Sequence, residues 1–145
     1  AHGIKTGVFF YTQALDAQTA ADEAEYVLQV IKDFPVSYPV AYDVESNYLL
    51  EQGLSTAQIT ENVNAFCKVI ADAGYCPIVY ANNDWLTNHL NTAEIPMHEG
   101  RLPLSLIQLM KEGPGQWSAS PLLRHIKNHQ IPVFFQVWRN QQYKK

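Results

Sequence analysis

Apolar and polar positions follow two different periods along the first two thirds of the chain. Residues 7–13, GVFFYTQ, are rich in β-branched and aromatic side chains and predict a strand. Residues 38–45, YPVAYDVE, and residues 76–82, CPIVYAN, have the same character and predict two more strands. All three segments end in polar side chains, so whatever chemistry the chain performs is expected where these strands end.

A helical period separates the first two predicted strands. Asp16 or Thr19 can cap a helix that extends to about Asp33. Its apolar stripe consists of Ala20, Ala24, Val27, Leu28 and Ile31. This spacing places the stripe on one face of the helix, where it can cover a sheet.

A second helix is predicted between the second and third strands. Ser55 and Gln58 form a capping-box pattern at its start, and Gly74 ends it. Its inward face consists of Ile59, Val63, Phe66 and Ile70. A further short helix is expected to start near Asn83 or Asp84.

Strands separated by helices of this length form βαβ units, which predicts an α/β fold with a parallel sheet. The sheet can close into a barrel or stay open and doubly wound, and both leave functional groups at the carboxyl ends of the strands. The side chains expected at this rim are Tyr11, Gln13, Asp43, Glu45, Tyr80 and Asn82. Phe9, which lies two residues before Tyr11 in the same predicted strand, is assigned to the core.

The charge changes sign along the chain. Residues 1–96 contain 12 acids and 3 bases, whereas residues 97–145 contain 2 acids and 7 bases. We therefore expect one domain of 145 residues, built from a β/α segment up to residue 96 and a divergent basic segment after it. Within the basic segment, residues 102–110 and 120–129 predict helices and residues 131–138 predict a strand.

Several classes of function are disfavoured by the composition. No apolar run approaches the ~20 residues that cross a bilayer, and the start, AHGIKTG, lacks the features of a signal peptide. The positive charge after residue 96 is too diffuse to indicate nucleic-acid binding. His125 and His129 have a metal-ligand spacing but no third ligand, so no metal site is expected. Cys67 and Cys76 are expected to remain thiols rather than form a disulfide.

The acids Asp43 and Glu45 are the strongest candidates for chemistry. Side chains two apart on a strand share a face, and Cα atoms ~6.6 Å apart allow carboxyl groups ~5–8 Å apart. That range suits the cleavage of glycosidic bonds, with one acid protonated and the other ionised. Tyr11 and Tyr80 at the same rim can stack on sugar rings. Metal ligation, helix capping or simple solvation of the two acids remain open on these residues alone.

Three blocks of the sequence resemble the glycoside hydrolase family 25 lysozymes. They are GIKTGVFFYTQALDAQTAADEAEYVL, YPVAYDVE and FCKVIADAGYCPIVYANNDWL, which together span about residues 3–90. The resemblance implies a modified or partial β/α barrel that cleaves the β-1,4 link between N-acetylmuramic acid and N-acetylglucosamine in peptidoglycan. It implies no metal or organic cofactor, and a secreted or wall-associated location.

The resemblance also implies roles for individual residues. Glu45 falls on the position of the general acid, and Asp43 on the position that stabilises positive charge at the reacting sugar or orients its acetamido group. Tyr11 and Tyr80 match aromatic residues of the family's rim, where Gln13 and Asn82 are further expected to bind substrate.

Parts of the family pattern are absent from this sequence. The family's first two strands, with an active-site Asp, have no counterpart, and the only acids after Pro96 are Glu99 and Glu112. Two hypotheses follow: an active peptidoglycan hydrolase, or a truncated relative that binds cell-wall glycan without cleaving it. A partial barrel also leaves strand edges uncovered, which favours self-association of the chain or pairing with a companion segment that this sequence lacks.

Overall fold

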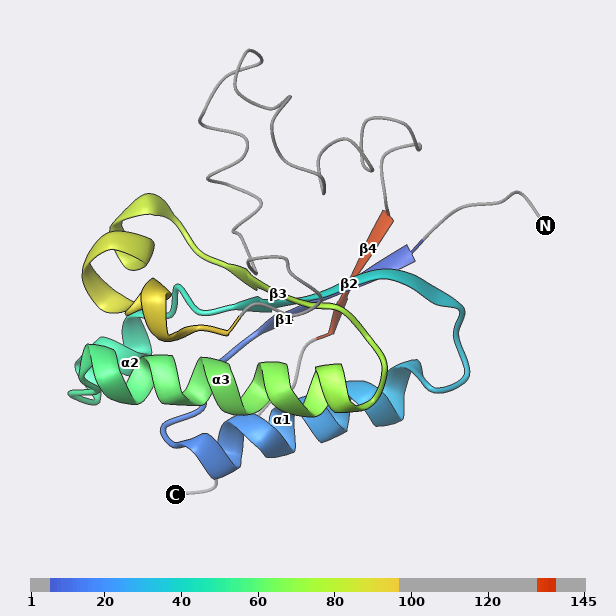
Figure 1. The fold of residues 1–145 in the computed structure, drawn as a ribbon, viewed down its shortest axis with the longest axis horizontal. Coiled ribbons are helices and arrows are strands. Elements are labelled where there is room, and N and C mark those ends of the chain that lie inside the picture. The colour runs from blue at the N-terminus through green and yellow to red at the C-terminus, as the bar shows by residue number, and fades with distance from the viewer. Residues whose placement is uncertain (1–5, 97–132, 138–145) are drawn as a thin grey trace, which may run out of the picture.

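A computed structural model describes residues 6–96 and 133–137 of the chain. Strands and helices alternate along the first of these ranges, and a further strand forms the second (Figure 1). The elements are β1 (Thr6–Tyr11), α1 (Ala17–Ile31), β2 (Val36–Asp43), α2 (Asn47–Glu51), α3 (Thr56–Asp72), β3 (Pro77–Tyr80), the π-helix η1 (Trp85–His89), the 3-10 helix η2 (Thr92–Glu94) and β4 (Val133–Val137). The three strands and two long helices predicted before residue 96 are therefore confirmed.

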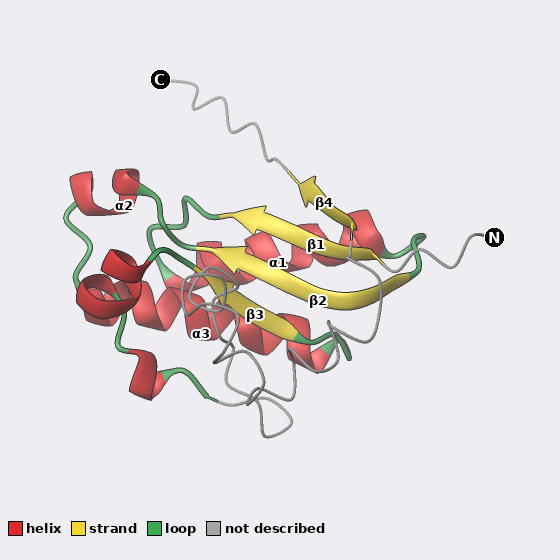
Figure 2. Ribbon diagram, turned by 90° about the horizontal axis from the view of Figure 1, so that it is seen from above, coloured by secondary structure: helices red, strands yellow, loops and turns green. Residues whose placement is uncertain are grey.

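The described strands form one parallel sheet in the order β3-β2-β1-β4. Helices α1 and α3 pack against each other and cover one face of this sheet (Figures 1 and 2). The α/β class with parallel strands and flanking helices is confirmed. The described strands make an open sheet rather than a closed barrel, as expected for part of a barrel.

The core lies between the sheet and the two helices. Phe10 of β1, Tyr42 of β2 and Phe66 of α3 are fully buried there, and the rings of Tyr42 and Phe66 stack with centroids 3.8 Å apart. Val8 and Phe10 belong to this core, so the alternation of a strand turns Phe9 and Tyr11 to the opposite face. The assignment of Phe9 to the core was therefore wrong: its side chain is half-buried on the face that α1 and α3 do not cover.

Local signals in the sequence set the helix boundaries. The Asp16 side chain accepts a hydrogen bond from the Thr19 N–H at 2.7 Å and caps α1. Ser55 and Gln58 form the predicted capping box of α3. Gly74 has a φ of 85°, a left-handed conformation that glycine adopts without strain and that ends the helix.

Burial confirms most of the predicted helix faces. All four residues predicted to face inward on α3 are buried, as are Ala20, Ala24, Val27 and Ile31 on α1, whereas Leu28 is half-buried. Glu23 is also buried on α1, which the apolar pattern did not predict. Helix α2 was not predicted either, because its five residues are too few to show a period.

The basic segment is described only where β4 lies. This strand confirms the one predicted at residues 131–138, and it pairs with β1 on the side away from β2. The helices expected at residues 102–110 and 120–129, and the pair His125 and His129, lie outside the described residues. Cys67 and Cys76 are both thiols, as expected.

Candidate active site

Three of the predicted site residues lie in one row across the sheet. Asp43 is the last residue of β2, and it pairs in register with Tyr11, the last of β1, and with Tyr80, the last of β3. Residues in register on parallel strands share a face, so all three side chains lie on the face opposite α1 and α3. The structure thus brings a carboxyl group between two tyrosines at the carboxyl end of the sheet.

Phe9 adds a further ring to this face of the sheet. Its ring meets that of Tyr80 edge-on, with centroids 4.9 Å apart and planes at 75°. The two rings come from β1 and β3, and the strand between them presents only the methyl group of Ala41 beside Phe9. The small side chain allows contact across β2, so an aromatic surface adjoins Asp43. The sequence pattern was interpreted as placing Phe9 in the core, although the alternation that makes Phe10 a core residue turns Phe9 to this face.

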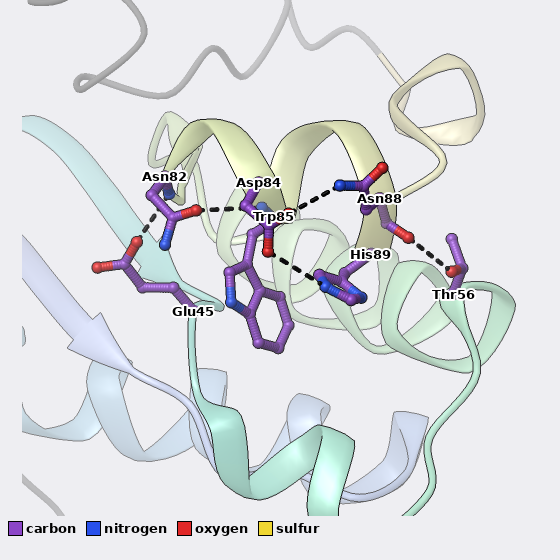
Figure 3. A network of polar contacts seen from close by, with 7 residues as sticks. All are labelled: Glu45, Thr56, Asn82, Asp84, Trp85, Asn88 and His89. Carbon is purple, nitrogen blue, oxygen red and sulfur yellow. Dashed lines mark hydrogen bonds and ion pairs between the residues drawn. The ribbon is translucent and has the colours of Figure 1, made fainter.

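Glu45 lies two residues beyond the end of β2 and approaches the end of β3. Its Oε2 accepts a hydrogen bond from the backbone N–H of Asn82 at 2.7 Å (Figure 3). The Val44 N–H donates to the Tyr80 carbonyl oxygen at 3.0 Å, which extends the pairing of the two strands to this point. The half-buried Glu45 carboxyl is therefore held by main-chain atoms.

The Asp43 carboxyl is more buried than that of Glu45, with 6% of the residue exposed. The pKa of Asp43 is raised to about 7, mainly by burial, and the nearby charge of Glu45 acts in the same direction. The hydrogen bond that the Glu45 N–H donates to Asp43 Oδ1, at 3.2 Å, opposes this shift. Asp43 is consequently neutral over much of the range below neutral pH.

The charges of both acids affect the pKa of Tyr80. Burial, followed by the charges of Glu45 and Asp43, raises the pKa of the Tyr80 hydroxyl above its ordinary value. The hydroxyl therefore stays protonated and can donate a hydrogen bond. Tyr80 combines this donor with a ring face beside the acids, which is what a sugar-binding tyrosine requires.

Asn82 caps the helical turn that follows β3. Its side-chain Oδ1 accepts from the Trp85 N–H at 3.1 Å, and its carbonyl oxygen accepts from the Leu86 N–H at 3.0 Å. Trp85 is buried, with 3% exposed, and anchors this turn in the core. The same residue thus holds Glu45 through its backbone N–H and the turn through its side chain (Figure 3).

Polar contacts tie the far end of this turn to α3. The Asn88 side chain donates to Asp84 Oδ1 at 2.7 Å, and His89 Nε2 lies 3.4 Å from Asp84 Oδ2. The Thr56 hydroxyl, at the start of α3, donates to the Asn88 carbonyl oxygen at 3.4 Å (Figure 3). The helical turn after β3, whose first residue holds Glu45, is therefore anchored at both ends.

Gln13 lies two residues beyond the end of β1. Its backbone N–H donates to Glu23 Oε1 on α1 at 3.2 Å. The structure thus ties the Gln13 main chain to the helix side of the sheet, and a contact of its side chain with substrate stays a prediction.

Neither a cluster of metal ligands nor a membrane-spanning helix is found in the described residues. There, no three His, Cys, Asp or Glu side chains come together as a metal site would require. In residues 6–96 and 133–137, no helix combines the length and apolarity needed to cross a bilayer.

The pattern of the family described as "Glycosyl hydrolases family 25" matches residues 1–103. The chain belongs to glycosyl hydrolases family 25. The matched residues include Tyr11, Asp43, Glu45 and Tyr80. The family suggested by the sequence blocks is therefore confirmed.

Two solved structures resemble this family 25 chain. The modular autolysin LytC from Streptococcus pneumoniae matches with a TM-score of 0.56 and 28% identity, over 64% of this chain and 23% of that chain. A structure of LytC in complex with a synthetic peptidoglycan ligand matches with a TM-score of 0.54 and 27% identity over the same shares. The chain spans about a quarter of the length of LytC. No curated protein matches it.

Proposed function

We propose that this chain is a peptidoglycan hydrolase that cleaves the β-1,4 link between N-acetylmuramic acid and N-acetylglucosamine. One observation carries the proposal: in a family 25 chain, Asp43 and Glu45 converge at the carboxyl end of the sheet beside Tyr11 and Tyr80. Glycan is the substrate class that this combination of two acids and aromatic rings favours. LytC, bound to a synthetic peptidoglycan ligand, supports the same choice of partner.

Glu45 acts as the general acid in this proposal. The Asn82 N–H already occupies Oε2, which leaves Oε1 to carry the proton in this proposal. Glu45 Oε1 donates its proton to the glycosidic oxygen as the bond from that oxygen to the anomeric carbon breaks. The leaving sugar departs with a new hydroxyl group, and positive charge develops at the anomeric carbon. Water then adds to that carbon and releases a proton, which completes the hydrolysis and replaces the proton that Glu45 gave up.

Asp43 assists by one of the two routes that the family implies. Its pKa of about 7 keeps it neutral in acidic solution, and a neutral carboxyl can donate a hydrogen bond to an amide oxygen. This property favours the orientation of the substrate's acetamido group over the direct stabilisation of positive charge. Tyr11, Tyr80, Gln13 and Asn82 are the proposed substrate-binding residues around the two acids, and no cofactor takes part in these steps.

Purified cell walls provide the test. Incubation with the chain should release new reducing ends, and Glu45→Gln should abolish most of that release. No release at any pH from 4 to 8 would reject the hydrolase. Binding of muropeptides without new reducing ends would instead assign the chain to the glycan-binding relative that the missing family acids left open.

The location follows from the proposed substrate. Peptidoglycan lies outside the cytoplasmic membrane, so we place the proposed activity in a secreted or wall-associated protein. Cell fractionation followed by detection of the protein with an antibody would test this placement.

A further inference from the structure

Glu23 is a carboxylate in an otherwise apolar face of α1. Only 3% of the residue is exposed, and it lies between Ala20 and Ala24 of the buried stripe. A charged group is costly to bury, and an apolar side chain at this place would avoid that cost. The buried position of Glu23 therefore needs an explanation, which its polar contacts provide.

The contacts of Glu23 join three separate segments. Its Oε2 accepts from the Thr12 hydroxyl at 2.7 Å and lies 2.9 Å from the Tyr42 hydroxyl, and its Oε1 accepts from the Gln13 N–H at 3.2 Å. The Tyr42 hydroxyl also lies 2.7 Å from Thr12 Oγ1, so the three side chains form one cluster. One carboxylate on α1 thus binds the end of β2 and the loop that follows β1.

This cluster reaches Asp43 through two short routes. Tyr42 directly precedes Asp43 in β2, and its side chain points to the helices while that of Asp43 points to the other face. The Thr12 N–H donates to the backbone carbonyl oxygen of Asp43 at 2.9 Å. Thr12 also directly follows Tyr11, so both strand ends of the candidate site depend on the same contacts.

We propose that Glu23 is a positioning residue that holds Asp43 and Tyr11 in place from the opposite face of the sheet, through Tyr42 and Thr12. This inference rests on the proposed function, because it concerns the geometry of that site. A displacement of about 1 Å can lower a reaction rate by about 10²-fold. A gain in activity from a fixed strand end can therefore offset the cost in stability of a buried carboxyl group.

The Tyr42 hydroxyl is suited to a permanent contact. Burial, followed by the charge of Glu23, raises the pKa of Tyr42 well above its ordinary value. The hydroxyl therefore keeps its proton throughout the pH range in which the site would act. Its role as a hydrogen-bond donor is constant, unlike the protonation state of Asp43.

The first experiment compares Glu23→Gln with Glu25→Gln, a matched control because Glu25 is an exposed residue of the same helix. Both replace a carboxyl group of α1 by an amide, but only the first disturbs the cluster. With cell-wall glycan as substrate, we expect Glu23→Gln to lower kcat by about 10- to 100-fold with little change in KM, and Glu25→Gln to leave both unchanged. A Glu23→Gln protein with a lower Tm but wild-type kcat would show that Glu23 only stabilises the fold, and would overturn the proposal.

A second pair of variants covers the case in which Glu23→Gln does not fold. Thr12→Ser keeps the hydroxyl that donates to Glu23, whereas Thr12→Val removes it at nearly constant volume. We expect Thr12→Ser to keep most of the wild-type kcat and Thr12→Val to lose about 10-fold or more. Equal kcat values for these two variants would contradict the proposal.

Amide hydrogen exchange separates this inference from the proposed function. If the wild-type chain does not cleave glycan, the proposed function fails, and exchange at the Thr12 N–H decides the positioning. We expect that exchange to be about 10-fold faster in Glu23→Gln than in Glu25→Gln, while α3 amides stay unchanged. Equal exchange at Thr12 in the two variants would overturn the positioning role whether or not the chain is active.

Discussion

Asp43 and Glu45 are separated by one residue, but their surroundings differ. Asp43 lies within the row of strand ends and is buried, whereas Glu45 is half-buried and accepts a main-chain hydrogen bond at 2.7 Å. Burial favours the neutral form of Asp43, since an ionised group loses its hydration there. The two carboxyl groups therefore lie in different environments, as their separate proposed roles require.

Replacement of Glu45 by Gln tests the general acid directly. The amide keeps the shape of the side chain but has no proton to donate, so we expect the rate of glycan cleavage to fall by about 10²- to 10⁴-fold. The free energy of unfolding should stay constant or rise, because one of two neighbouring acidic charges is removed. A protein with lower Tm and nearly intact activity would indicate a structural role for Glu45.

Replacement of Asp43 by Asn tests the pKa of about 7. The ordinary value is 3.8, so between these pH values the folded state binds a proton that the unfolded state has lost. The stabilisation is complete below about pH 4 and is lost as the pH rises through 7. Asp43→Asn never ionises at this position. We therefore expect its free energy of unfolding to increase by about 1–3 kcal/mol, relative to that of wild type, as the pH rises from 5 to 8.

Urea unfolding at several pH values measures this difference. A constant gap between Asp43→Asn and wild type from pH 5 to pH 8 would show that the Asp43 carboxyl has an ordinary pKa. The pH dependence of activity provides a second test. Wild-type cleavage should decline as the pH rises above about 7, because Asp43 then loses the proton with which it hydrogen-bonds to the substrate.

The turn after β3 links the stability of an element to the geometry of the site. Asn82 caps it through the Trp85 N–H and holds Glu45 through its own N–H. Its neighbour α3 begins with a capping box whose hydrogen bonds join Ser55 to Gln58 rather than to either acid. The two caps thus differ in whether they also hold a residue of the candidate site.

Alanine substitution at these two caps should separate stability from activity. We expect Asn82→Ala and Ser55→Ala each to lower the free energy of unfolding by about 1 kcal/mol. Only Asn82→Ala should also lower kcat, by about 10-fold or more, because the hydrogen bond that holds Glu45 becomes less ordered. An equal loss of activity in both variants would mean that the effect follows from stability alone.

At the scale of the whole molecule, the described sheet is open. Strands β3 and β4 are its outer members, and the chain spans about a quarter of the length of LytC. The outer strand of a parallel sheet carries N–H and C=O groups that another strand can pair with. Edge pairing is therefore the contact expected between copies of this chain.

Light scattering after size-exclusion chromatography tests this self-association. We expect a mass above that of the 16.4 kDa monomer, and one that increases with protein concentration. A monomer at every concentration would contradict the expectation.

Features that depend on local order along the chain were predicted from the sequence. The strands and the two long helices follow from apolar periodicity, and the caps at Asp16 and Ser55 follow from short-range hydrogen bonds. The approach of Asp43 to Tyr11 and Tyr80 was also expected, since parallel strands place their carboxyl ends at one edge. These features need only the residue order and the rules of βαβ connection.

Contacts between residues distant in the chain were decided by the tertiary structure alone. The hold of Asn82 on Glu45 spans 37 residues, and the contact of Tyr42 with Glu23 spans 19. A polar residue at an inward position of α1 was the one signal of the Glu23 cluster, but it names no partner. The place of β4 beside β1 also depends on packing, because periodicity predicts a strand without predicting which edge it joins.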